Sequence, residues 1–215
     1  MIARRSPFVV LALVAMLLAG CVAAPADSAE TPVAQPLATR RPPLAPCDLT
    51  PVAVPTRPAE IPRYAQLDEA TGLHVTGIVP ESIDLESWRL TVGGSVPNPL
   101  SLTYDDLRCM ARIEATPRLV CPGFFEDVAL WAGVPLRDLL EAAGAPTSGV
   151  RVRLYGADDY DQLIPIETAM SPTAMVAYEW EGEPLPFIHG FPARIVLPGS
   201  TGSLWVKWLY RIEVE

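Results

Sequence analysis

Beyond residue 62 the chain is built from short apolar runs separated by polar residues and turn formers. Runs of this length, bounded by glycine and proline, predict β-strands rather than long helices. We expect strands at residues 73–79, 88–92, 117–121, 150–155, 173–180, 193–197 and 205–214, with the strand at 117–121 buried.

Three segments between these strands have helical features. Thr103 can cap a short helix that runs to Cys109. Residues 134–144 predict a second helix, with Pro135 in its first turn and Gly144 just past its end. A third is expected at 166–170. Many strands with short helices among them, in no regular alternation, predict an α+β domain of mixed β-sheet over residues 63–215.

The N-terminal region is of a different kind. Arg4 and Arg5 precede an apolar run over residues 8–19. The end of this run and the next two residues form the segment Leu18-Ala19-Gly20-Cys21. A charged start, a short apolar run and small residues before a cleavage point are typical of a signal peptide. The last four residues resemble a lipobox, so residues 1–20 are expected to be removed and Cys21 to carry a lipid. The alternative is an ordinary signal peptide with a cysteine there by chance.

Residues 21–62 are rich in alanine and proline, with ten prolines between residues 22 and 62. Proline lacks the backbone N–H and fixes its own φ, so this stretch cannot form a long helix or a central strand. It predicts an extended tether between the lipid and the domain.

Charge excludes one class of partner. The formal net charge is −9, and no cluster of basic residues could neutralise phosphates, so nucleic acid is not expected to bind. The acidic balance is equally explained as a solubility device.

Two segments carry the candidate chemistry, because phosphate-binding loops, dinucleotide fingerprints, paired zinc histidines and serine elbows are all missing from the sequence. One is Cys121-Pro122-Gly123, and the other runs from His189 to Trp208. Together they resemble the molybdopterin-binding domain of the sulfite oxidase family, and the resemblance extends over about 140 residues to the C-terminus.

By this resemblance Cys121 is the one protein ligand of molybdenum, a soft metal that favours thiolate sulfur. The same resemblance assigns cofactor binding to Asp158, His189, Arg194, Trp205, Val206 and Lys207. Arg194 and Lys207 suit the phosphate of the pterin, and Asp158 its ring. The alternatives are a buried free thiol for Cys121, surface ion pairs for the two cations and a hydrogen-bonded turn for His189.

The sequence also departs from the family pattern. Where family members carry an arginine that contacts an anionic substrate, this chain has the stretch at residues 74–77, without arginine. The basic residues that follow the ligand cysteine are replaced by Phe124, Phe125, Glu126 and Asp127. These four residues predict a pocket rim that repels anions, so sulfite is not the expected substrate. The family's C-terminal dimerisation domain and its active-site tyrosine have no counterpart before Glu215.

The four cysteines allow one further expectation. If Cys21 carries lipid and Cys121 binds metal, Cys47 and Cys109 remain to form a disulfide, the alternative being two unpaired thiols.

The sequence thus predicts a lipid-anchored molybdenum–molybdopterin oxidoreductase outside the cytoplasm. Its expected partners are the membrane, a small-molecule substrate and a redox protein. The alternative is a module at the cell surface that kept the fold but binds a partner instead of a cofactor.

Overall fold

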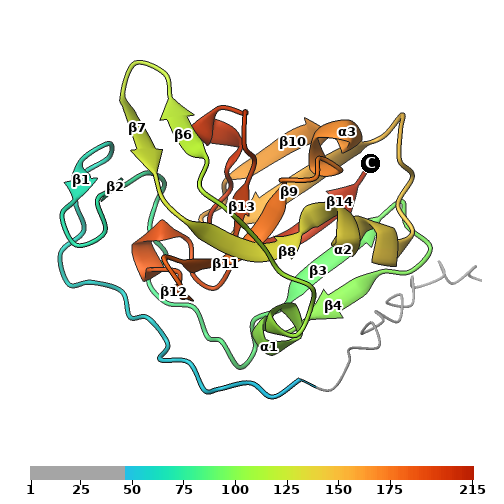
Figure 1. Cartoon of the computed structure of the whole chain (residues 1–215), viewed down its shortest axis with the longest axis horizontal. Helices are drawn as coiled ribbons and strands as arrows, with labels where there is room; N and C mark the ends of the chain where they lie inside the picture. Colours follow the sequence, from blue (N-terminus) through green and yellow to red (C-terminus); the bar gives the residue numbers. More distant parts are fainter. Residues whose placement is uncertain (1–46) are drawn as a thin grey trace, which may run out of the picture. The chain divides into compact units, whose positions relative to one another are not determined.

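The structure, a computed structural model, describes residues 47–215. The predicted signal peptide, Cys21 and the first part of the tether lie outside the described residues. The described part consists of mixed β-sheets with a few short helices, which confirms the α+β class (Figure 1).

The first of two larger sheets contains the C-terminal strand at its centre. Its strand order is β10 (Asp161–Pro165), β9 (Arg151–Gly156), β14 (Leu209–Val214), β3 (Leu90–Gly94) and β4 (Leu100–Leu102). Strands β14 and β3 run parallel, and the other neighbours are antiparallel. Burial alternates along β3 and β9, as expected for strands with one face on the core.

The second sheet has the order β12 (Glu183–Pro184), β11 (Met175–Trp180), β8 (Trp131–Pro135) and β5 (Ile113–Ala115), and β13 (Arg194–Val196) also pairs with β11. Every residue of β8 is buried. A Cβ atom on Gly133 would overlap the backbone of Val176, so only glycine allows β8 and β11 to lie this close.

Helix α2 (Leu136–Ala143) joins the two sheets, because it contacts β3 of the first and β8 and β11 of the second. Leu136, Leu139, Leu140 and Ala143 form its buried face. Gly144 ends it in the left-handed region with φ of 75°, as the sequence predicts. The predicted start is wrong, since β8 extends to Pro135, which caps the helix instead of lying in its first turn.

Two other helices were predicted and are confirmed. The N-terminus of α1 (Tyr104–Arg108) is a reciprocal capping box: the Thr103 hydroxyl accepts from the Asp106 amide at 3.0 Å, and the Asp106 carboxylate accepts from the Thr103 amide at 2.9 Å. Helix α3 (Ile166–Ala169) is a single turn capped by Met170.

Two predicted strands are much shorter than expected. Of residues 73–79, only β2 (Leu73–His74) is paired, with β1 (Leu67–Asp68), and the chain turns away at Gly77 with φ of 76°. Of residues 205–214, only β14 is a strand. A 3₁₀ turn, η2 (Gly202–Leu204), precedes Trp205, and Trp208 has φ of 49°. Neither conformation continues a strand.

The strand predicted at 117–121 is present but is not buried throughout. Strand β6 (Arg118–Cys121) pairs with β7 (Phe125–Val128) in a hairpin outside both large sheets, and a single bridge joins Val120 to Thr201. Arg118 is exposed, and Leu119 is the one residue of β6 classed as buried. The hairpin therefore presents its side chains to the space beside the sheets.

Residues 47–62 contain no helix or strand, as their prolines predict. They are not a free tether, however. Val52 and Ile61 pack against the core, and the carbonyl of Thr50 accepts a hydrogen bond from Arg108 at 2.8 Å. Cys47 is joined to Cys109 in a disulfide with the Cα atoms 5.8 Å apart. Within residues 47–215, none of the helices has the length and apolar character needed to cross a membrane.

The disulfide provides a first prediction. It spans 62 positions of sequence, and closing a loop of this size restricts the unfolded chain by about 4 kcal/mol. We expect Cys109→Ser to lose about this much unfolding free energy in urea, and the Cys47→Ser, Cys109→Ser double variant to lose no more. Peptide mapping without reductant should recover the linked pair. Free alkylation of Cys109 in the unreduced protein would contradict the assignment.

Candidate functional site

A pocket of about 490 Å³ lies between the β6–β7 hairpin, the loop after β2 and the segments on either side of β13. The predicted site residues that line it are Cys121, Asp158, His189, Arg194, Trp205 and Lys207. Val206 does not line the pocket. It is buried, and its side chain lies close to Gly156, where it would contact an added Cβ atom. Val206 thus supports the wall from behind.

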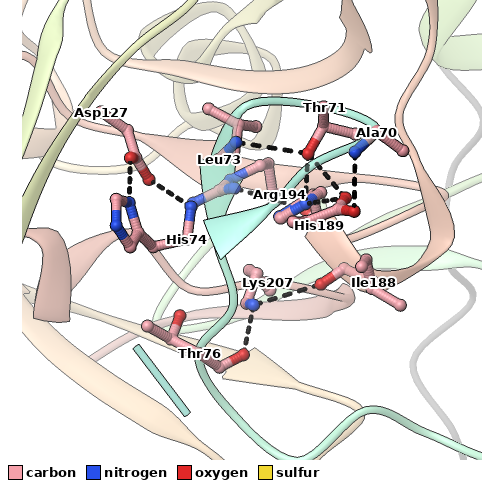
Figure 2. Close-up of polar contacts among 11 residues, drawn as sticks. Ala70, Thr71, Leu73, His74, Thr76, Asp127, Ile188, His189, Arg194 and Lys207 are labelled. Atoms are coloured by element: carbon pink, nitrogen blue, oxygen red, sulfur yellow. Dashed lines mark hydrogen bonds and ion pairs between the residues drawn. The ribbon is translucent and has the colours of Figure 1, made fainter. Parts of the chain in front are cut away.

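Arg194, at the start of β13, is a buried cation held by backbone oxygens (Figure 2). Its guanidinium donates to the carbonyl of His189 at 3.0 Å, which Figure 2 shows. It also donates to the carbonyl of Trp205 at 3.5 Å. The guanidinium carbon lies 4.6 Å from the centre of the Trp131 ring. The Nε atom is buried without a hydrogen-bond partner. Burial lowers the pKa of Arg194 to about 9.

Lys207 is the second buried cation. Its Nζ atom donates to the carbonyls of Thr76 and Ile188, the latter at 3.2 Å (Figure 2). It lies 4.7 Å from the centre of the Trp208 ring. Burial, and then the charge of Arg194, lower the pKa of Lys207 well below its ordinary value.

Among the described residues, neither Arg194 nor Lys207 forms an ion pair with a carboxylate. An isolated buried charge costs several kcal/mol unless an opposite charge compensates it. Two buried cations that line the same pocket therefore favour the binding of an anionic ligand. The alternative, that each forms a surface ion pair, is wrong, because both side chains are buried.

His189 ends the 3₁₀ turn η1 (Phe187–His189). Its Nε2 atom lies 2.9 Å from the Thr71 hydroxyl and 3.1 Å from the Asp68 carboxylate. The Thr71 hydroxyl donates its only hydrogen to Asp68 at 2.6 Å, so Nε2 must be the protonated ring nitrogen. Burial and the charge of Lys207 lower the pKa of His189 to about 4, which keeps the ring neutral near pH 7.

Asp158 follows β9 and lies beside two glycines. A Cβ atom on Gly77 would lie 2.9 Å from the Asp158 carboxylate, and one on Gly156 would lie 2.6 Å from it. Burial raises the pKa of Asp158, while hydrogen bonds from backbone amides and the charge of Lys207 oppose this rise. The two glycines thus allow the carboxylate to reach the pocket wall.

Cys121 is the last residue of β6, where the chain turns back into β7. The turn is closed by the Phe124 amide, which donates to the Cys121 carbonyl at 3.0 Å, and Gly123 adopts φ of 80°. The thiol is free and the residue is partly exposed. A cysteine held at such a turn projects its sulfur into the pocket.

The rim expected at residues 124–127 is half wrong. Phe125 and Asp127 line the pocket, whereas Phe124 is exposed outside it and Glu126 pairs with Arg118 on the outer side of the hairpin. Successive residues of a strand point to opposite sides, so β7 can present only every second side chain. Arg118 therefore supplies no positive charge to the pocket.

His74 was not predicted as a functional residue. The Asp127 carboxylate accepts from the His74 backbone amide at 2.9 Å and from its Nδ1 atom at 2.6 Å (Figure 2). The imidazole stacks on the Phe125 ring with centroids 4.3 Å apart. The alternation of Phe125 and Asp127 along β7 is the sequence signal that places Asp127 on this face, but nothing local in the sequence points to its partner.

Tyr64, Ile78 and Tyr160 complete the outer wall of the pocket, and all three are exposed. The Tyr160 hydroxyl donates to the carbonyl of Ser203 at 2.9 Å. Within residues 47–215, no group of three or more histidine, cysteine, aspartate or glutamate side chains is arranged to hold a metal ion.

Comparison with known proteins gives this pocket a context. The profile described as oxidoreductase molybdopterin binding domain matches residues 76–215. Human mitochondrial sulfite oxidase is 35% identical over 164 aligned residues, covering 62% of this chain and 30% of that protein. The putative protein-methionine-sulfoxide reductase subunit YedZ1 of Azospira oryzae is 29% identical, covering 61% of this chain and 50% of that protein. The chain thus spans about 30% of the length of human sulfite oxidase.

A solved structure shows the same fold. The sulfane dehydrogenase SoxCD from Paracoccus pantotrophus superposes with a TM-score of 0.58 at 30% identity, covering 67% of this chain and 41% of that chain.

The glycine at position 77 provides a second prediction, with a matched control in Gly149. Both have φ of 76°, but a Cβ atom on Gly149 meets nothing within 4 Å, whereas on Gly77 it meets Asp158 and Trp208. Gly149→Ala should lose about 1–2 kcal/mol of unfolding free energy from backbone strain alone. Gly77→Ala should lose more, because Asp158 or Trp208 must also move. Urea denaturation measures both, and equal losses would show that the wall tolerates a methyl group.

Proposed function

Because the chain belongs to the family of the oxidoreductase molybdopterin binding domain, we propose that it is an enzyme in which Cys121 ligates molybdenum and whose substrate is not sulfite. The family implies a molybdenum–molybdopterin cofactor. The observation that carries the proposal is the pair of buried cations without a carboxylate partner, Arg194 and Lys207, in the same pocket as the free thiol of Cys121.

The residues present fit this cofactor. Molybdopterin carries a phosphate, and phosphate is bound well by a planar guanidinium and a lysine together. The buried Nε atom of Arg194, which has no partner, is a donor ready for such an oxygen. Gly77 and Gly190 leave room in the pocket wall because glycine has no Cβ atom. A Cβ atom on Gly190 would lie 3.0 Å from Arg194 and 3.2 Å from Lys207.

Each remaining residue has a definable task. Cys121 supplies the soft thiolate ligand that molybdenum favours. Asp158 accepts hydrogen bonds from donors on the pterin ring, and neutral His189 offers a ring nitrogen opposite the one bound to Thr71 and Asp68. Trp205 and Val206 hold the wall. When bound, the cofactor supplies two-electron oxo-transfer chemistry, and the protein supplies orientation and electrostatics.

The pocket walls favour a neutral substrate. A small dianion must exchange its hydration for fixed positive charge, and without such charge its desolvation is uncompensated. Arg194 and Lys207 are engaged by backbone carbonyls and directed to the cofactor phosphate, and neither Arg63 nor Arg118 lines the pocket. The outer wall offers mainly Tyr64, Ile78, Phe125 and Tyr160. A neutral sulfoxide with apolar substituents suits these walls, and the name of the relative YedZ1 refers to methionine sulfoxide in proteins.

A binding module without cofactor is the alternative. It would need some other anion to compensate the charges of Arg194 and Lys207, so the site geometry favours the enzyme.

We further propose that the enzyme is anchored at the outer side of a membrane through a lipid on Cys21. The signal-peptide pattern of residues 1–21 supports this, and metabolic labelling with a fatty acid that is lost in Cys21→Ser would test it.

A third prediction concerns the metal ligand. Cys121→Ser should abolish molybdenum binding or turnover in protein made in a pterin-producing host, because a hydroxyl replaces the soft sulfur. The domain should stay folded, with a change below about 1 kcal/mol, since the residue is partly exposed. Arg118→Gln, on the same hairpin but outside the pocket, is the control. Elemental analysis and thermal melting decide; wild-type metal content together with wild-type turnover in Cys121→Ser would refute the assignment.

A fourth prediction concerns the substrate. Molybdenum-loaded protein should show little sulfite-dependent reduction of an artificial electron acceptor. Ile78→Arg places a cation on the exposed pocket wall and should lower the KM for sulfite, whereas Val128→Arg places the same charge outside the pocket and should not. Saturable, efficient oxidation of sulfite by the wild type at modest ionic strength would show that the argument from charge is wrong.

A further inference from the structure

The geometry points to His74 as the group that exchanges protons with the substrate during oxo transfer, with Asp127 holding it in place. This inference rests on the proposed function and goes beyond it, because it names the residue that completes the chemistry of that site.

Asp127 fixes both the position and the tautomer of His74. Its carboxylate binds the backbone amide and Nδ1 of the same residue, at 2.9 and 2.6 Å, so the ring cannot rotate without losing a contact. An ionised carboxylate only accepts hydrogen bonds, so Nδ1 carries a proton in the neutral ring as well as in the charged one. The proton that can be gained and lost is therefore the one on Nε2.

The ring packs against the hairpin that carries the expected metal ligand. His74 stacks face to face on Phe125, with an interplanar angle of 9°. Phe125 is the cross-strand partner of Cys121 in the β6–β7 hairpin. The Phe125 ring therefore separates the His74 imidazole from Cys121. All three residues line the pocket.

His74 combines a fixed position with access to water. Its side chain is 25% exposed, whereas that of Asp127 is 5% exposed. No described residue hydrogen-bonds to Nε2, so this atom is available to a substrate or a water molecule. A proton donor needs both features, since it must reach the substrate and then be reloaded.

The other titratable and charged groups of the pocket are less suited. They are Tyr64, Cys121, Asp158, Tyr160, His189, Arg194 and Lys207. His189 is neutral and already bound at Nε2 by Thr71 and Asp68. Lys207 donates to two carbonyls, and the Tyr160 hydroxyl to one. Asp158 lies against Gly77 and Gly156. Asp127 already accepts a hydrogen bond from His74.

The reaction needs such a group because oxo transfer moves protons with electrons. For a sulfoxide the balance is R₂SO + 2 e⁻ + 2 H⁺ → R₂S + H₂O, in which the sulfur is reduced, the S–O bond breaks and the oxygen leaves as water. The electrons come from a one-electron donor such as a reduced viologen, two equivalents per turnover. His74 delivers a proton from Nε2 to the departing oxygen and regains one from solvent.

The experiment compares four molybdenum-loaded proteins: wild type, His74→Gln, Asp127→Asn and Glu126→Gln. Glu126 is the adjacent carboxylate, which pairs with Arg118 outside the pocket. Each protein is reduced with two equivalents of viologen and mixed with dimethyl sulfoxide in a stopped-flow instrument across the neutral pH range. Removal of a general acid costs about 100-fold or more in rate.

We expect His74→Gln to keep wild-type molybdenum content but to be reoxidised at least about 100-fold more slowly. Asp127→Asn should be slowed and Glu126→Gln unchanged.

A second readout does not depend on activity. The chain has two histidines, and both have a hydrogen-bonded ring N–H, so the downfield proton resonance that disappears in His74→Gln is assigned to Nδ1–H of His74. It should be present in the wild type and Glu126→Gln and lost in His74→Gln and Asp127→Asn.

Three results would overturn the inference: equal rates in the wild type and His74→Gln, loss of molybdenum from His74→Gln, or a downfield signal unaffected by Asp127→Asn. The first two leave the proposed function standing, since wild-type protein still reacts. A wild type that takes up no molybdenum, or that is not reoxidised by the sulfoxide, would instead refute the proposed function and the inference with it.

Discussion

The burial of two positive charges without a carboxylate is the constraint on which the site depends. Arg194 and Lys207 are held by four backbone carbonyls, those of His189 and Trp205 for the first and of Thr76 and Ile188 for the second. These carbonyls belong to three separate loops. The cations therefore fix the loops relative to one another before any ligand arrives, and the carbonyl dipoles offset only part of the cost of burying the charges. An anionic ligand supplies the rest.

The two sheets hold the strands that position these buried cations. Strand β13 pairs with β11, and β11 with β8, so Arg194 starts from a strand buried in the second sheet. Strand β14 lies at the centre of the first sheet, and Lys207 precedes it by two residues. Both cations thus project from the ends of rigid strands. The hairpin that carries Cys121 belongs to neither sheet, although a bridge from Val120 to Thr201 ties it to the loop before η2.

The sequence predicted what depends on local chemistry. The capping box of Thr103, the left-handed Gly144 and the joining of Cys47 to Cys109 follow from residue types and from counting. The long specific segment from His189 to Trp208 indicated the family and, with Cys121 and Asp158, the predicted residues that line the pocket, namely His189, Arg194, Trp205 and Lys207. Strand lengths were less predictable. Val75, Val79, Trp205, Val206 and Trp208 are buried although they lie in turns and loops, so these segments have the same hydrophobic pattern as a strand. Tertiary burial, not local periodicity, decides such segments.

The error at residues 124–127 also shows how charge is distributed in the pocket. Strand β7 presents Phe125 and Asp127 to the pocket and Glu126 to the other side, while Phe124 lies in the turn before the strand. Two carboxylates adjacent in sequence therefore have different surroundings. Asp127 is buried and accepts hydrogen bonds from the backbone amide and Nδ1 of His74. Its negative charge also opposes the lowering of the pKa of Arg194 and of Lys207, although it forms no ion pair with either. The hairpin therefore contributes one carboxylate to the pocket, and the two cations remain the groups that favour an anion. In the proposed function the cofactor phosphate takes that place, and a neutral substrate is left the space between Cys121 and His74.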